Sequence, residues 1–212
     1  MSAALLTLAD SRLPAGGHTH SGGVEQAIAA GVVSGPASLA GFLLRRLTTS
    51  GRVAAGLAAA ACRGGDLAGL DAEADARTPS PALRAASRQQ GRGLVRVGRR
   101  AWPSPLWDAL PAAPHHPVAL GVAAAAGGLT PSDAAAAAAY LSVSGPATAA
   151  QRLLAMDPLT VAALTARLAP EIDAVAGGSL RGADGPLPAD TDPLLDLLAE
   201  VHAARKDRFF AS

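Results

Sequence analysis

The sequence has few aromatic residues and a single cysteine. Aromatic residues make up only 3% of the 212 residues, whereas 50% of the residues are hydrophobic. The core must therefore be built from small aliphatic side chains, which favours closely packed helices over a β-sandwich. The lone Cys62 excludes a disulfide framework and is expected to be a small buried residue in a reducing compartment.

An excess of charge of either sign is also missing. The chain has 18 Lys and Arg residues against 17 Asp and Glu residues, which gives a formal net charge of +1. This balance provides no general attraction to nucleic acid or to a membrane surface. No run of about 18 apolar residues is free of glycine, proline or charge, and the first residues lack the basic region of a signal peptide. We therefore expect a cytoplasmic protein that binds neither nucleic acid nor membrane.

Several common enzymatic motifs are absent as well. The sequence contains no GxxxxGK[ST], no GxSxG and no HExxH. Its carboxylates are too scattered to indicate an acid–base pair. We expect no catalytic residues, and the sequence indicates a domain that binds something.

Proline residues mark the expected helix starts. Thr78-Pro79, Thr130-Pro131, Asp157-Pro158 and Asp192-Pro193 are typical of an N-cap followed by proline at the first helical position. No segment shows sustained alternation of apolar and polar residues. The sequence predicts one all-α domain of about ten helices, several of them short, over residues 24–31, 36–49, 52–64, 66–76, 79–101, 115–127, 131–142, 146–155, 158–176 and 193–206.

The expected domain has a core and a C-terminal extension. Residues 1–176 are predicted to form the helical core, with an irregular connector over 102–114. Residues 177–191 are rich in Gly, Pro and Asp and are predicted to form a flexible loop. Residues 192–212 then form a flexibly attached helix and a tail that can dock a partner.

A glycine-rich loop follows the first apolar run. Between Pro14 and Gly23 the chain carries four glycines, which allow positive φ and close backbone approach, so we expect a shaped loop. His18 and His20 in this loop, with His115 and His116, are weak candidates for a transition-metal site. The alternative is that they are loop histidines hydrogen-bonded to the backbone.

A ladder of arginines runs along the predicted helix 79–101. Its members recur every four residues, so they sweep a broad helical face: Arg84, Arg88, Arg92, Arg96 and Arg100. We expect this face to be solvated or to meet acidic residues of a protein partner. Gly91 and Gly93 in the same helix predict close approach by another backbone segment.

Five segments together resemble the urease accessory protein F family (UreF). In the family's order they are Leu13-Pro14-Ala15-Gly16-Gly17-His18-Thr19-His20-Ser21-Gly22-Gly23-Val24-Glu25, Leu83-Arg84-x-x-Ser87-Arg88-Gln89-Gln90-Gly91-Arg92-x-Leu94, His115-His116-Pro117-x-x-x-Gly121, Ala149-Ala150-Gln151-Arg152-Leu153-Leu154 and Arg208-Phe209-Phe210-Ala211-Ser212. Within them, a structural role is expected for Pro14, Gly23, Ser87, Gln90, Gly91 and Gln151. His18 and His20 stand where the family usually has an aromatic residue and a tyrosine.

The resemblance implies a non-enzymatic, all-α homodimer. Members of the family bridge the GTPase UreG and UreD, called UreH in some organisms, in a complex that delivers nickel to apo-urease. No cofactor of its own is expected, and nickel is expected to pass through the complex. The expected GTPase-facing residues are Gly16, Gly17, His18, His20, Ser21, Glu25, Arg88 and Arg92. The expected UreD-facing residues are Arg205, Lys206, Arg208, Phe209, Phe210 and Ser212.

Two other classes of protein remain open at this point. The four candidate histidines could serve a metal-storage or metal-sensing protein, which would have to bind nickel as an isolated chain. A helical enzyme could use the His-rich loop as general base. It would need a deep pocket that holds a histidine or carboxylate with a shifted pKa.

Overall fold

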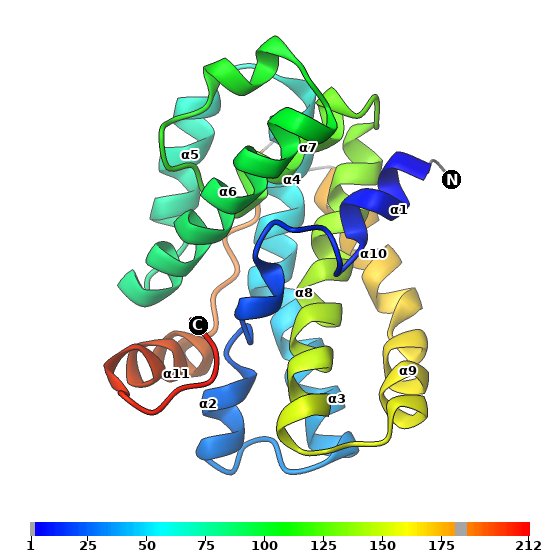
Figure 1. Ribbon diagram of the computed structural model, residues 1–212, viewed down its shortest axis with the longest axis vertical. Helices are drawn as coiled ribbons and strands as arrows, with labels where there is room; N and C mark the ends of the chain where they lie inside the picture. Colours follow the sequence, from blue (N-terminus) through cyan, green and yellow to red (C-terminus); the bar gives the residue numbers. More distant parts are fainter. Residues whose placement is uncertain (1–2, 181–185) are drawn as a thin grey trace.

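A computed structural model describes residues 3–180 and 186–212 (Figure 1). Within these residues the regular secondary structure is entirely helical, which confirms the predicted all-α class. In chain order the helices are α1 (Ala3–Ala9), α2 (Val24–Ala29), α3 (Pro36–Arg46), α4 (Arg52–Arg63), α5 (Leu67–Ala76), α6 (Pro81–Ala101), α7 (His116–Ala126), α8 (Pro131–Leu153), α9 (Pro158–Arg167), α10 (Ala169–Leu180) and α11 (Pro193–Ala204). Short 3₁₀ turns lie at η1 (Gly17–Thr19) and η3 (Pro105–Ala109), and a π-helical turn, η2 (Leu47–Gly51), joins α3 to α4. The helix α1 was not predicted from the sequence.

The centre of the molecule is formed by α4, α7 and α8, which pack on one another. Their buried residues are mainly alanine, valine and leucine, as the composition indicates. Small residues allow the backbones to come close: a Cβ added at Gly121 of α7 would lie 2.3 Å from the carbonyl oxygen of Ala58 in α4.

The predicted helix caps are largely confirmed. Thr130 accepts a hydrogen bond from the Asp133 amide and forms a capping box with that residue, and Asp157 and Asp192 cap α9 and α11. At α6 the cap is Ser80, whose hydroxyl accepts from the amide of Leu83, so this helix begins two residues later than predicted.

The predicted break before Pro146 is wrong, because α8 continues through this proline. Proline has no N–H to donate to the carbonyl four residues earlier, which here belongs to Ser142. The side chain of Arg46 supplies the missing donor, with its Nε 3.1 Å from the Ser142 oxygen. A side chain from α3 therefore stabilises the helix at the position where its own backbone cannot.

The single helix predicted over 158–176 is instead two helices. Its first part, α9, ends at Arg167, and α10 begins at Ala169 and continues to Leu180. Pro170 has no N–H to donate to the carbonyl of Ala166 four residues earlier, which accounts for the break. Residues 177–180, predicted to belong to the flexible loop, are the last turn of α10, and residues 181–185 of that loop lie outside the described part.

The C-terminal helix α11 packs against α2 and α6 and does not stand apart as predicted. It buries Leu195, Leu198, Ala199 and His202, and Arg45 of α3 forms an ion pair with its capping residue Asp192. His202 is therefore in the interior. Of the helices in the described residues, none has the length and apolar character needed to cross a membrane.

Candidate functional site

The N-terminal loop and the C-terminal tail, predicted as two separate surfaces, lie in contact. Figure 1 shows the red C-terminal segment reaching back to the blue N-terminal segment beside α2. The loop is shaped by glycines with positive φ at Gly16, Gly22 and Gly23, where L-residues would be strained. This glycine-built turn exposes Gly17 and His18 and buries His20 and Ser21.

Three hydrogen bonds join the loop to the tail directly. The amide of Ser21 donates to the carbonyl oxygen of Ser212 at 2.5 Å, and the amide of Ala211 donates to the carbonyl oxygen of Thr19 at 2.7 Å. The Nδ1 atom of His20 lies 2.6 Å from the hydroxyl of Ser212. The last residues of the chain thus complete the structure of the loop.

Glu25, at the start of α2, holds the C-terminal tail (residues 205–212) in place. Its Oε2 lies 3.0 Å from Nε2 of His202, and its two carboxylate oxygens accept the amides of Phe209 and Phe210 at 2.9 and 3.0 Å. Burial by itself raises the pKa of Glu25, but these hydrogen bonds outweigh it and hold the pKa below its ordinary value. Next to it, Gln26 accepts a hydrogen bond from Arg205 at 3.1 Å.

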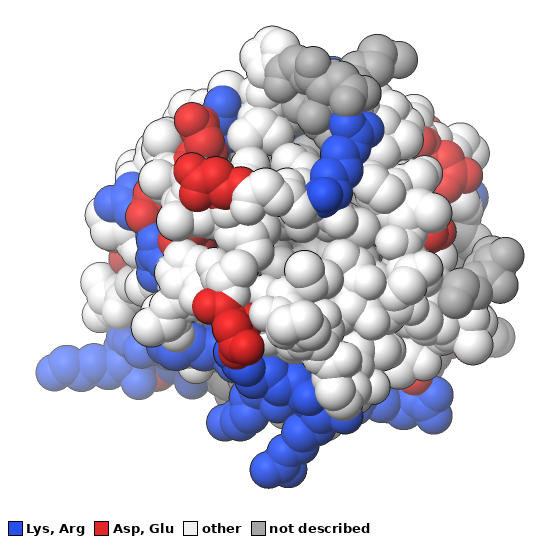
Figure 2. Space-filling model, turned by 90° about the horizontal axis from the view of Figure 1, so that it is seen from above, with Lys and Arg blue, Asp and Glu red and all other residues white. Residues whose placement is uncertain are grey.

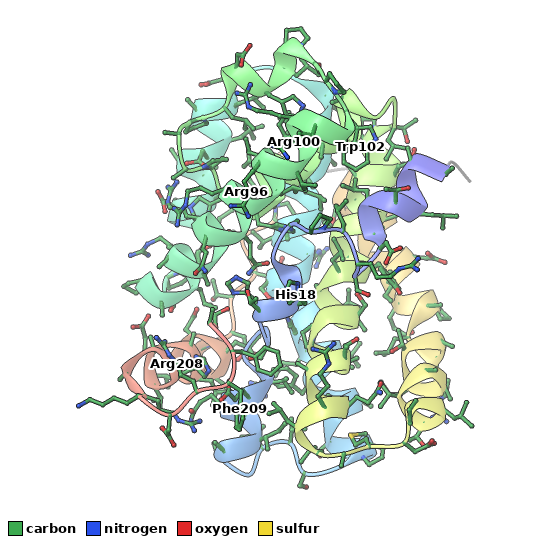
Figure 3. The ribbon with its side chains drawn as sticks, in the orientation of Figure 1. His18, Arg96, Arg100, Trp102, Arg208 and Phe209 are labelled. Atoms are coloured by element: carbon green, nitrogen blue, oxygen red, sulfur yellow. The ribbon has the colours of Figure 1, made fainter. Side chains whose placement is uncertain are left out.

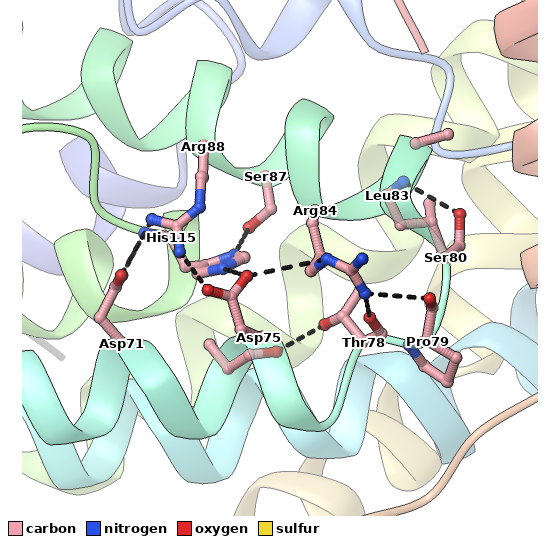
Figure 4. A network of polar contacts seen from close by, with 12 residues as sticks. Asp71, Asp75, Thr78, Pro79, Ser80, Leu83, Arg84, Ser87, Arg88 and His115 are labelled. Atoms are coloured by element: carbon pink, nitrogen blue, oxygen red, sulfur yellow. Dashed lines mark hydrogen bonds and ion pairs between the residues drawn. The ribbon is translucent and has the colours of Figure 1, made fainter.

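A second polar cluster joins α5, α6 and the start of α7 (Figure 4). His115 is only 1% exposed. Its Nδ1 lies 3.0 Å from the hydroxyl of Ser87 and its Nε2 2.9 Å from a carboxylate oxygen of Asp75. Arg88 bridges Asp71 and Asp75 at 2.9 and 2.5 Å, and Asp71 also accepts the His115 amide at 2.7 Å.

The groups in this cluster are of the types found in a hydrolase triad, but their contacts indicate a structural role. The Ser87 hydroxyl is already the acceptor for the amide of His116 at 3.1 Å, and Asp75 is neutralised by Arg88. Both ring nitrogens of His115 are engaged, so neither is available to a metal ion. In the described part of the chain, no group of three or more His, Cys, Asp or Glu residues could hold a metal ion.

A cavity of about 490 Å³ lies between this cluster and the loop–tail contact. Helices α4, α6, α8 and α11 contribute to its wall, and its lining includes Arg46, Gln90, His116 and Ser212. Burial, with a smaller contribution from His20, lowers the pKa of His116 to about 4. Burial, with a smaller contribution from His18, likewise lowers the pKa of His20 to about 4. A pocket and histidines with shifted pKa values, which the enzyme alternative requires, are therefore present, and the Ser87 hydroxyl in the lining is already engaged with His115 and with the amide of His116.

The two shifted histidines predict how stability depends on pH. Each is neutral in the folded protein down to about pH 4, whereas an unfolded histidine takes up a proton near pH 6.5. The unfolded state binds more protons in this window, so the free energy of unfolding falls as the pH is lowered from 7 to 5. We expect a loss of about 1.5 kcal/mol for each histidine, after allowing for residual solvent contact. Urea unfolding at several pH values measures this loss, and H116N should remove about half of it. If the free energy of unfolding of H116N depends on pH as steeply as that of the unmodified protein, the lowered pKa of His116 is contradicted.

The structure divides the predicted GTPase-facing residues. Gly17, His18 and Arg92 are exposed, whereas His20, Ser21 and Glu25 are buried under the tail. Arg88 is tied into the His115 cluster. Gly93 allows the loop to contact α6 closely. A Cβ at this position would lie only 2.2 Å from the carbonyl oxygen of Ala15.

The predicted tail residues also differ in their surroundings. The side chain of Phe209 is 88% exposed, Lys206 and Arg208 are exposed, and Phe210 packs partly against the core. Figure 3 shows Phe209, Arg208 and His18 on the same side of the molecule. Of the family-motif positions, Gly91 contacts the backbone at Pro114, Gln90 lines the cavity, and Gln151 is half-buried in α8.

Sequence reasoning missed four residues that hold these sites together: Asp71, Asp75, His202 and Gln26. Asp71 and Asp75 are spaced four residues apart on one face of α5, which is a signal that could have indicated a shared partner. No local pattern marks His202 or Gln26. Burial, with a smaller contribution from Asp133, raises the pKa of the half-buried Cys62 thiol to about 11, in keeping with an unreactive cysteine.

Comparisons with known proteins agree with this architecture. A family model described as UreF matches residues 33–169. A protein named urease accessory protein UreF from Mycolicibacterium vanbaalenii is 54% identical over 99% of this chain and 98% of its own length. Proteins of the same name from Mycobacterium marinum and Mycobacterium tuberculosis strain H37Rv are 55% and 50% identical, each over 99% of this chain and 98% of its own length.

These matches define an all-helical urease accessory protein. Within that class, the chain belongs to the UreF family.

Proposed function

We propose that this chain is a non-enzymatic scaffold that bridges the GTPase UreG and UreD/UreH. In this proposal it acts as a homodimer in the cytoplasm and positions the GTPase in the complex that delivers nickel to apo-urease. Family membership supports the role in urease maturation. The chain needs no cofactor, and nickel is the cargo of the complex.

The observation that carries the bridging role is the anchored tail with its exposed aromatic side chain. The amide of Phe209 is fixed by Glu25, while the ring is 88% exposed. An aromatic residue whose backbone is already held in place loses less conformational freedom on binding, and aromatic residues are enriched at the centres of protein interfaces. Lys206 and Arg208 beside it add positive charge. We assign this surface, residues 205–212, to UreD.

The substitution F209A tests this assignment. It removes the ring but keeps the amide that donates to Glu25, so the tail stays anchored. We expect the affinity for UreD to fall at least tenfold, as for an interface hot spot, with no change in the melting temperature. Pull-down and calorimetry with purified UreD measure the loss, and deletion of 205–212 should abolish binding.

A matched control comes from α9, where Leu159 is 78% exposed. L159A removes a comparable exposed apolar group at another surface and should leave UreD binding unchanged. If UreD binds F209A and the deletion variant as tightly as the unmodified protein, the assignment of this surface to UreD is wrong.

A further inference from the structure

The arginine ladder of α6 is divided into a paired and an unpaired half. Arg84 and Arg88 face α5: Arg88 bridges its two aspartates, and Arg84 lies 3.9 Å from Asp75. The next three members, Arg92, Arg96 and Arg100, are exposed and form no hydrogen bond or ion pair with any residue that the structure describes. The neighbouring Arg99 is different, since it pairs with Asp108 at 2.7 Å.

The positive charges of Arg92, Arg96 and Arg100 destabilise α6 when no partner is bound. Like charges four residues apart destabilise a helix by about 0.2–0.5 kcal/mol per pair. Cations in the last helical turn interact favourably with the helix dipole, which accounts for Arg100. That effect does not reach Arg92 or Arg96, which lie further inside α6. A bound partner with negative charge would offset the repulsion between these arginines.

The row of three arginines lies next to the N-terminal loop on α6. Successive members of the row are rotated by about 40° and separated by about 6 Å along the axis, so the row covers one face over about 12 Å. Gly93, within the row, lets the backbone at Ala15 lie directly on α6. Figure 3 shows Arg96 and Arg100 on the same side as His18, and Figure 2 shows Lys and Arg side chains gathered along one edge of the molecule.

We propose that Arg92, Arg96 and Arg100, together with the loop at His18, bind an acidic surface of the GTPase partner. This rests on the proposed function, in which the chain binds that GTPase. A protein is favoured over nucleic acid because no aromatic side chain alternates with the arginines on α6 and the net charge is only +1. Arg88, which was expected on this surface, is excluded because its charge is already neutralised by Asp71 and Asp75.

The test compares two double charge reversals that change the net charge equally. R96E/R100E reverses the proposed surface, and R152E/R167E reverses two exposed arginines on α8 and α9 that have no partner in the described residues. Association of each purified full-length variant with the purified GTPase is measured at low and at physiological salt. We expect R96E/R100E to lower the association rate at least tenfold at low salt and to flatten its salt dependence. R152E/R167E should stay within twofold, and R96Q/R100Q should be intermediate.

All the altered side chains are exposed, so we expect every variant to fold. Thermal melts of all variants check this. If the unmodified protein does not bind the GTPase, the proposed function fails. If it binds, but R96E/R100E binds equally well or R152E/R167E is impaired to the same extent, the proposed function stands and the α6 surface is wrong. Binding of duplex RNA that R96E/R100E abolishes would overturn the assignment in favour of nucleic acid.

Discussion

Replacing Glu25 with alanine is expected to release the segment 205–212 and to lower the free energy of unfolding by about 3 kcal/mol. A buried polar group that loses its hydrogen-bond partner costs about 1–3 kcal/mol, and Glu25 is the partner of three such groups. Here His202 is left unpaired in the interior, and the amides of Phe209 and Phe210 lose their acceptor. Urea unfolding measures the loss.

Trypsin provides an independent measure of tail release. Arg205, Lys206 and Arg208 are trypsin sites within the tail, and we expect E25A to be cut there faster than the unmodified protein. The control is E73A, which removes the exposed Glu73 of α5 from its pair with the half-buried Arg77 and should cost less than about 1 kcal/mol. Equal losses in E25A and E73A, or a tail that stays protected in E25A, would contradict the anchoring role.

Replacing Gly91 with alanine is expected to destabilise the protein by more than about 3 kcal/mol, above the usual cost of an added methyl group. The new Cβ would lie 1.9 Å from the carbonyl oxygen of Pro114. Because that oxygen belongs to the backbone, it cannot rotate away, and α6 must separate from the segment before α7. This movement would also pull His115 away from Ser87 and Asp75.

Gly41 in α3 provides the opposite case. It lies inside a helix, and a Cβ added there would meet nothing within 4 Å. G41A should therefore raise the stability by up to about 1 kcal/mol, the usual difference between the two residues in a helix. Denaturant unfolding of both variants gives the comparison. A loss in G91A no larger than 1 kcal/mol would show that the two segments are not in such close contact.

Features set by local chemistry could be predicted from the sequence. The residues at the N-termini of α8, α9 and α11 identified their own caps, because the side chain and the proline act within one turn. Gly91 and Gly93 identified two close backbone approaches, because glycine inside a helix is unfavourable without such a reason. The composition indicated a helical core of small residues, because a chain with few aromatic residues must fill its core with small aliphatic side chains.

Features set by distant residues could not be predicted. Pro146 reads as a helix break in isolation, and only Arg46, a hundred positions earlier in the chain, reverses that interpretation. The burial of His202 depends on Glu25 at the other end of the sequence. The resemblance identified both the loop and the tail as functional, but nothing in either segment indicates that they touch.

The contact between loop and tail also has a kinetic consequence. His20 and Ser212 are separated by 192 positions in the sequence, and pairs so far apart gain contact energy only after the chain between them has been ordered. The loop from Gly16 to Gly23 therefore acquires its final hydrogen bonds late, after the helices that separate the two segments have assembled. During synthesis on the ribosome it remains without its partner until residues 209–212 emerge. A partner that recognises the finished loop therefore selects chains that have completed folding.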